Sequence, residues 1–194
     1  MHELCGQRCT RRGQRYSGSA FSRIRSLSCC AAGEPPDPHK AVPFNLIAKA
    51  IHHDGQPPEL AWPYLQTLPA DIGAWHPPLA CAPIFHREFL LEAGSLDRIV
   101  EYLETSRPVV VVMNVSRSFY QPGSDAVING NAKEPAINTH AVIAVGLGRR
   151  ENSALLLIRN SWGQPWGLRG HAWLTEDYLR PRLLGIGAAN LKES

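Results

Sequence analysis

The stretch NTHAVIAVGLGRRENSALLLIRNSWGQPWGLRGHAWLTEDYL, residues 138–179, decides the fold. Apolar segments at 140–148, 154–160 and 170–176 predict strands, and the last of them alternates apolar with polar residues. The connection RRENS joins the first two segments as in a hairpin. A capped helical turn is expected next, ending at Pro181. The stretch therefore predicts neighbouring strands of an antiparallel sheet.

The residues before this stretch add one strand and several helices. VVVVMNV at 109–115 is a β-branched run typical of a buried strand. Ser95 is expected to cap a helix that runs to about Ser106, and the apolar spacing predicts further helices at 44–53 and 20–30. A mostly helical first half thus precedes a mostly β second half, which indicates an α+β fold with two lobes.

Charge and hydropathy exclude several classes of protein. The 194 residues hold 20 Lys and Arg against 17 Asp and Glu, a net charge of +3 that predicts neither a nucleic-acid nor a membrane partner. No apolar run approaches the ~20 residues of a membrane span, and no secretory signal is visible, so the expected location is cytoplasmic. The basic residues 1–12 are interpreted as a solvated or disordered end, with an RNA-contacting arm or a targeting peptide as the alternative.

The cysteines suggest neither a disulfide framework nor a metal centre. Their number is odd and no export signal accompanies them, so free thiols are expected. The first four lack the paired C-x-x-C spacing of zinc sites, and no metal or other cofactor is predicted. The cysteines are Cys5, Cys9, Cys29, Cys30 and Cys81.

Two polar residues frame the predicted hairpin. His140 begins one strand and Asn160 ends the next, so both side chains are expected at one rim of the sheet. An Asn160 amide oxygen that accepts the His140 Nδ1 proton would orient the imidazole and leave Nε2 to exchange a proton with a nucleophile. Taken singly, His140 would be interpreted as a structural histidine and Asn160 as a turn residue.

The joint pattern resembles a known family. THAVIAVGLG and IRNSWGQPWGLRGHAWL are similar to the histidine strand and the asparagine motif of papain-like cysteine peptidases. The resemblance implies catalytic roles for His140 and Asn160, with Trp162 as the indole that shields their bond from water. It covers about 13–190, and 54–65 is similar to bacterial members. Further residues at positions that match the motif are Gly163, Trp166, Gly167 and Gly170.

The resemblance also implies an architecture and a partner. A helical lobe at about 13–106 would pack on an antiparallel sheet or barrel at about 107–194, with a cleft between them and residues 1–12 outside the domain. The partner would be a peptide or a protein, and the family needs no cofactor.

The family's nucleophilic cysteine has no counterpart at the matching position. The best match to the surrounding signature is RRGQRYSGSAFS, residues 11–22, which places Gly18 at the nucleophile and Arg12 at the oxyanion-stabilising glutamine. The separation of Gly18 from His140 and Asn160 is close to the ~130 to 150 residues typical of the family. Glycine offers no atom that attacks a carbonyl.

Three readings follow. The first is a papain-like cysteine peptidase whose hydrolysis of peptide bonds is impaired or abolished by Gly18 and Arg12. The second is a non-catalytic peptide-binding or regulatory pseudopeptidase that uses the family's cleft to bind a ligand without cleaving it. The third is an active enzyme that uses Cys9 or Cys5, whose distances from His140 also fit, although no apolar helix follows Cys9. The serines that flank Gly18 are expected to point away from the nucleophile position.

Overall fold

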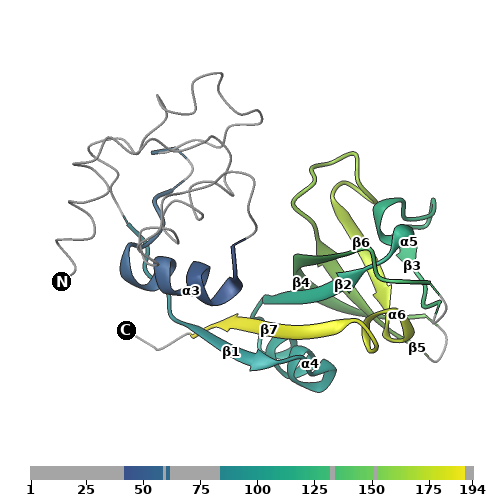
Figure 1. Cartoon of the computed structure of the whole chain (residues 1–194), viewed down its shortest axis with the longest axis horizontal. Helices are drawn as coiled ribbons and strands as arrows, with labels where there is room; N and C mark the ends of the chain where they lie inside the picture. Colours follow the sequence, from purple (N-terminus) through teal and green to yellow (C-terminus); the bar gives the residue numbers. More distant parts are fainter. Residues whose placement is uncertain (1–41, 59, 62–83, 132–133, 151–152, 191–194) are drawn as a thin grey trace. The chain divides into compact units, whose positions relative to one another are not determined.

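A computed structural model describes most of the chain after residue 41. It divides the chain into two compact units, 1–89 and 90–194 (Figure 1). The helix expected at 20–30, the positions of Gly18 and Arg12, and all five cysteines lie outside the described residues. The described ranges are 42–58, 60–61, 84–131, 134–150 and 153–190.

The described part of the first unit contains one helix. This is α3 (Phe44–His53), as its apolar spacing predicts, and its face with Ala50 is buried. The helix ends before Gly55, whose positive φ of 73° and bond from its N–H to the Ala50 carbonyl close the last turn. Gln56 then forms an isolated antiparallel bridge with Phe85.

The second unit is built on a seven-stranded sheet with the order β1-β7-β2-β4-β5-β6-β3. Four neighbouring pairs, β2–β4, β2–β7, β4–β5 and β5–β6, are antiparallel, whereas β3 and β6 are parallel. The α+β class is therefore confirmed, but the sheet is mixed and open rather than wholly antiparallel or closed into a barrel. The strands are β1 (Phe89–Ala93), β2 (Val109–Val115), β3 (Val127–Ile128), β4 (Asn138–Arg150), β5 (Ser153–Arg159), β6 (His171–Thr175) and β7 (Leu183–Ala189).

Strand β2 forms the middle of the core. Its side chains alternate strictly, and Val109, Val111, Met113 and Val115 are completely buried. On one side it pairs with β4 in a register that sets Met113 opposite His140. The predicted β-branched strand is thus confirmed, and it fixes the position of His140 along the sheet.

Three helices accompany this sheet. In α4 (Leu96–Glu104) the Ser95 hydroxyl accepts the Arg98 N–H, as the predicted cap requires, although the bond is long at 3.4 Å. The helical turn predicted before Pro181 is α6 (Glu176–Leu179), capped by Thr175. The four-residue α5 (Arg117–Tyr120) was not predicted. Among the described residues no helix is long and apolar enough to cross a membrane.

The division into units differs from the predicted lobes. The helical lobe was expected to extend to about residue 106, yet α4 belongs to the unit of the sheet. The reason is that Ile99 and Tyr102 of α4 join the same hydrophobic core as Val109 and Val111 of β2. Burial, rather than helical composition, therefore decides where the helix belongs.

Two strands, the edge strand β1 and its neighbour β7, were also missed. Residues 89–93, which lie within the predicted helical lobe and had no element assigned, form β1. Strand β7 contains Gly185 and Gly187, which weaken the strand signal of the sequence. Pairing with Val112 and Val110 of β2 places these glycines in the sheet nevertheless. Tertiary pairing overrides local propensity in both segments.

Candidate active site

The structure brings His140 and Asn160 together. His140 lies near the start of β4, and Asn160 follows the last residue of β5, the neighbouring antiparallel strand. Their side chains are joined by a hydrogen bond of 2.8 Å between His140 Nε2 and Asn160 Oδ1. The antiparallel pairing of β4 with β5 returns the chain to the same rim of the sheet, as the spacing predicts.

The nitrogen that makes this bond is not the predicted one. The Ser161 N–H donates to the same Asn160 oxygen at 2.8 Å, which identifies that atom as the acceptor. His140 Nε2 must then carry the proton that it donates, and Nδ1 has the free lone pair. The prediction that Nδ1 faces Asn160 was wrong because Nε2, the nitrogen farther from the backbone of β4, reaches across to Asn160. A nucleophile would therefore exchange its proton with Nδ1.

Asn160 is held by hydrogen bonds to its side chain and from its backbone. Its side chain is buried, and its backbone N–H donates to the Gly170 carbonyl at 2.9 Å. Among the described residues, its Nδ2 has no hydrogen-bond partner. A buried donor without a partner is destabilising, so this orientation of the amide is kept by the two bonds to Oδ1.

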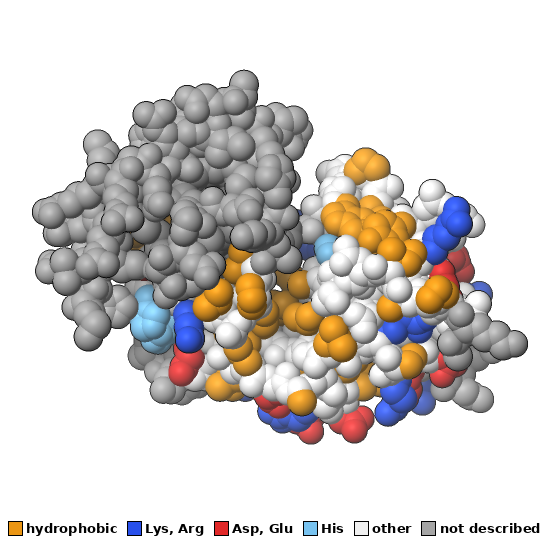
Figure 2. Space-filling view, viewed as in Figure 1, with side chains coloured by type: hydrophobic (Ala, Val, Ile, Leu, Met, Phe, Trp, Pro, Cys, Tyr) orange, Lys and Arg blue, Asp and Glu red, His pale blue; other side chains and the backbone are white. Residues whose placement is uncertain are grey.

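Aromatic rings cover the histidine. The Trp162 ring lies 4.8 Å from the His140 ring, and Phe119 packs against both, at 5.7 Å from His140 and 5.5 Å from Trp162. Tyr120 stacks on Trp162 at 5.0 Å. Phe119 is fully buried, whereas Tyr120 and Trp162 are partly exposed, and Figure 2 shows hydrophobic side chains gathered on this part of the surface. The predicted shielding role of Trp162 agrees with this position.

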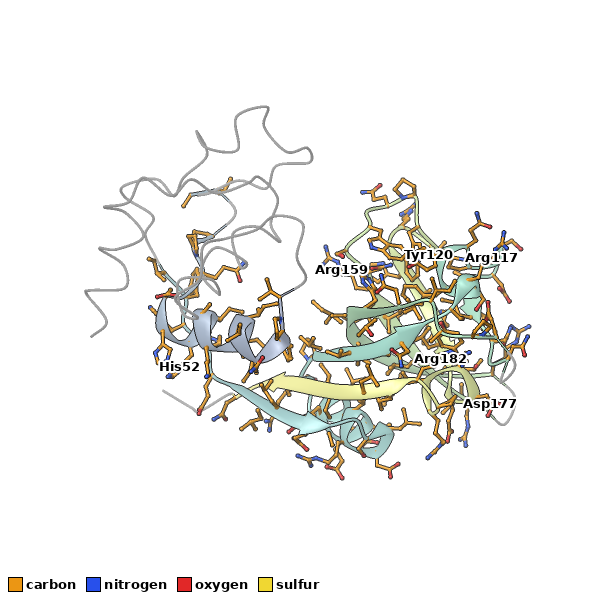
Figure 3. The ribbon with its side chains drawn as sticks, viewed as in Figure 1. His52, Arg117, Tyr120, Arg159, Asp177 and Arg182 are labelled. Carbon is orange, nitrogen blue, oxygen red and sulfur yellow. The ribbon has the colours of Figure 1, made fainter. Side chains whose placement is uncertain are left out.

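Phe119 and Tyr120 were missed by sequence reasoning. Both belong to α5, which is too short to give a periodic signal. The local sign of a packed turn in this region is an aromatic pair that follows the buried strand after three residues and precedes Pro122 and Gly123. Figure 3 labels Tyr120 on this short helix.

The loop that carries Trp162 depends on glycine. Gly163, Gly167 and Gly170 all have positive φ, at 82°, 56° and 83°. A side chain at Gly167 would also collide with the carbonyl oxygen of His171. The Trp166 indole N–H anchors the loop to α5 by donating to the Phe119 carbonyl at 2.9 Å. The spacing of Trp and Gly in the motif thus shapes the loop that covers His140.

Comparisons with known proteins identify the family of this chain. Residues 85–182 match the model of the family described as papain family cysteine protease, and they make up about half of the chain. This chain belongs to the papain family. It is 29% identical over 141 residues to cathepsin Q of Rattus norvegicus, a match that covers 69% of this chain and 39% of the relative. It is 36% identical over 89 residues to a cysteine protease of Blomia tropicalis, covering 45% of this chain and 27% of the relative.

A solved structure supports the papain-like fold independently. Xylellain, a cysteine protease from Xylella fastidiosa, superposes with a TM-score of 0.68 at 19% sequence identity. The superposition covers 88% of this chain and 69% of xylellain. At this identity the likeness shows the fold alone. The chain spans less than half the length of the two curated relatives above.

In this papain-family site the environment of His140 disfavours the charged imidazole. Burial lowers the pKa of His140 below its ordinary value of 6.5, and the hydrogen bond to Asn160 opposes that shift only in part. Among the described residues, no carboxylate shifts this pKa. The imidazole is therefore expected to be neutral at pH 7, with its proton on Nε2.

We expect His140 to titrate below pH 6.5, and Asn160→Ala to lower its pKa further because the hydrogen bond that favours the charged form is lost. Two-dimensional NMR of the imidazole nitrogens against pH would measure both values. Because the pKa of His140 is lower in the folded chain, the unfolded chain binds more protons than the folded chain as the pH falls below about 6.5. The resulting contribution to stability is present above that pH and is lost as the pH falls through the folded-state pKa. An His140 pKa above 6.5 in the native chain would contradict the described environment.

The remaining predicted site residues are not described. The assignments of Gly18 to the nucleophile position and of Arg12 to the oxyanion position stay predictions, as do the catalytic roles of His140 and Asn160. In the parts of the chain that the structure describes, no group of three or more His, Cys, Asp or Glu side chains is placed to hold a metal ion.

Proposed function

We propose that this papain-family domain retains the His140–Asn160 pair that transfers protons in a cysteine peptidase. Gly18 at the nucleophile position impairs or abolishes its hydrolysis of peptide bonds. The supporting observation is the bond from His140 Nε2 to Asn160 Oδ1 beneath Trp162. That bond leaves Nδ1 of His140 as a proton acceptor, so the imidazole can act as a general base toward a nucleophile.

The reaction that this pair would serve has two stages. A thiol gives its proton to His140 Nδ1, and the thiolate attacks the peptide carbonyl carbon. The imidazolium then protonates the departing amine, which leaves a thioester on the sulfur. A water molecule attacks that thioester, with His140 first accepting and then returning a proton. Gly18 offers no sulfur for the first stage, and Arg12 replaces the neutral amide that would donate to the oxyanion.

The proposed ligand is a peptide or a protein. Membership of the papain family supports this class of ligand, and no metal or other cofactor enters the proposed chemistry. The cytoplasmic location and the likeness to bacterial members stay predictions, which fluorescence microscopy of the tagged chain and a phylogeny would test.

A second candidate is a peptide-binding or regulatory pseudopeptidase. It is favoured by the stacked Tyr120–Trp162 pair, which keeps 40% and 38% of its two side chains exposed beside His140. Exposed aromatic rings of this kind bind apolar side chains readily. Recovery of a stoichiometric peptide with the native chain, and its loss in Trp162→Ala, would favour this candidate. Recovery of equal amounts of peptide with the native chain and with Trp162→Ala would contradict this candidate.

A peptidyl epoxide, which alkylates reactive thiols irreversibly, distinguishes the proposal from an enzyme that uses Cys9 or Cys5. We expect no adduct on any of the five cysteines at neutral pH, because none is assigned to the position that His140 would activate. Mass spectrometry of the intact and digested protein measures the adduct, and total labelling by iodoacetamide in denaturant shows that the thiols are reduced. An adduct on Cys9 or Cys5 that disappears in His140→Ala would overturn the proposal.

A further inference from the structure

A partly buried polar cluster lies next to α5, the helix that carries part of the aromatic cover of His140. It connects the end of β2, the segment before β4 and the segment between α6 and β7. Glu134 is its centre, because its carboxylate accepts from the Ser116 hydroxyl at 2.8 Å and from the Ser118 hydroxyl at 2.7 Å. The members of this cluster are Ser116, Ser118, Glu134, Tyr178 and Arg182.

The carboxylate also caps α5. Glu134 Oε1 accepts the backbone N–H of Ser118 at 2.8 Å, and this N–H lies in the first turn of the helix. Ser116, the residue at the N-cap, makes no side-chain cap bond of its own to the helix. A helix of four residues is not stable by itself, because formation of the first helical turn is unfavourable and few further hydrogen bonds follow it. The position of α5 therefore depends on the bonds that Glu134 accepts.

Glu134 is itself fixed from the opposite side. Arg182 is buried and donates to the backbone carbonyls of Glu134 at 2.9 Å and Asn131 at 3.1 Å. Its guanidinium also lies 4.5 Å from the centre of the Tyr178 ring, and the Tyr178 hydroxyl accepts the Ser116 N–H. Figure 3 shows Arg182 in the same unit as Tyr120. The donors around the carboxylate, Ser118 first, hold the pKa of Glu134 below its usual range, so the charged acceptor is present at neutral pH.

The helix that Glu134 caps carries the cover of the candidate site. Phe119 packs against His140, Trp162 and Trp166, and its carbonyl holds the Trp166 indole. Tyr120 supports Trp162 by stacking on it. Movement of α5 would therefore loosen the rings that keep water from His140.

We infer that Glu134 is a positioning residue, whose carboxylate fixes α5 so that Phe119 and Tyr120 keep Trp162 over the His140–Asn160 bond. This inference rests on the proposal that His140 and Asn160 form the site. It goes beyond that proposal by adding a residue that touches neither of them.

The test compares Glu134→Ala with Glu134→Gln and with Asp125→Asn. Asp125 is a matched control, because it is an exposed carboxylate that also accepts a backbone N–H, from Val127, and pairs with Arg150. We expect Glu134→Ala to raise the pKa of His140 toward about 6.5, since water reaches the imidazole, and to speed hydrogen exchange of the Trp166 indole N–H. In Glu134→Gln the pKa of His140 and the exchange rate of the Trp166 indole should stay close to those of the native chain. Asp125→Asn should change neither.

NMR of the imidazole and indole groups provides both readouts, and circular dichroism reports whether the variants fold. If Glu134→Ala does not fold, Ser116→Ala with Ser118→Ala removes two of the donors to Glu134 and should give the same shift in His140. A folded variant of either kind with unchanged His140 titration and unchanged indole exchange would overturn the inference. These readouts need no peptidase activity, so failure of the proposed function would be seen separately, in the reaction of the Gly18→Cys variant.

Discussion

Replacing Gly18 by cysteine is expected to raise thiol-dependent peptidase activity above that of the native protein, in which we propose that hydrolysis is impaired or abolished. The substitution would place a sulfur at the position that the papain-family pattern assigns to the nucleophile, and the Asn160 bond leaves His140 Nδ1 free to accept its proton. Removal of the nucleophile in a comparable triad lowers the rate on the order of 10⁶-fold, so even partial recovery is measurable. Cleavage of a fluorogenic peptide pool by native and variant proteins would measure it.

Two further variants make this prediction sharper. Gly18→Cys with His140→Ala should lose the gained activity, because the thiol then has no proton acceptor. Adding Arg12→Gln to Gly18→Cys should increase the rate, since one oxyanion donor contributes about 10²- to 10³-fold in related chemistry. If neither Gly18→Cys nor the double variant with Arg12→Gln cleaves any peptide, the assignment of position 18 is wrong.

Phe119→Ala is expected to be the most destabilising single change near the site. Its ring is completely buried and contacts His140, Trp162 and Trp166, so truncation leaves a cavity beneath the cover. Loss of a buried aromatic ring costs about 3 to 5 kcal/mol of unfolding free energy. Urea denaturation followed by circular dichroism would measure the loss.

Leu168→Ala is the matched control for this prediction. Leu168 lies in the same loop as Trp166 but is 64% exposed, so its truncation should change the free energy of unfolding by no more than about 0.5 kcal/mol. A cost below about 1 kcal/mol for Phe119→Ala would contradict the packing described above.

The sequence predicted the centre of the sheet well because its signal there is strong. The β-branched run of β2 and the apolar segments of β4 and β5 favour strands. The contact of His140 with Asn160 followed from where the two residues stand in the hairpin. The choice between Nδ1 and Nε2 did not follow, because it depends on how far the imidazole reaches from the strand.

The parts that sequence reasoning missed depend on contacts between distant segments. Strand β7 is a strand because it pairs with β2, although Gly185 and Gly187 lower its own propensity. Helix α5 exists because Glu134, sixteen residues away from Ser118, caps it. No periodicity within four residues could indicate that arrangement, and so Phe119 and Tyr120 were not recognised as part of the site.

The most direct test of the account follows the protonation of His140 in the native chain and in Gly18→Cys at pH 7. Imidazole nitrogen NMR distinguishes a neutral ring with its proton on Nε2 from an imidazolium. We expect the neutral Nε2–H form in the native chain, and an imidazolium in Gly18→Cys, where a thiolate stabilises the charge. An imidazolium already present in the native chain, or a neutral ring in both proteins, would contradict it.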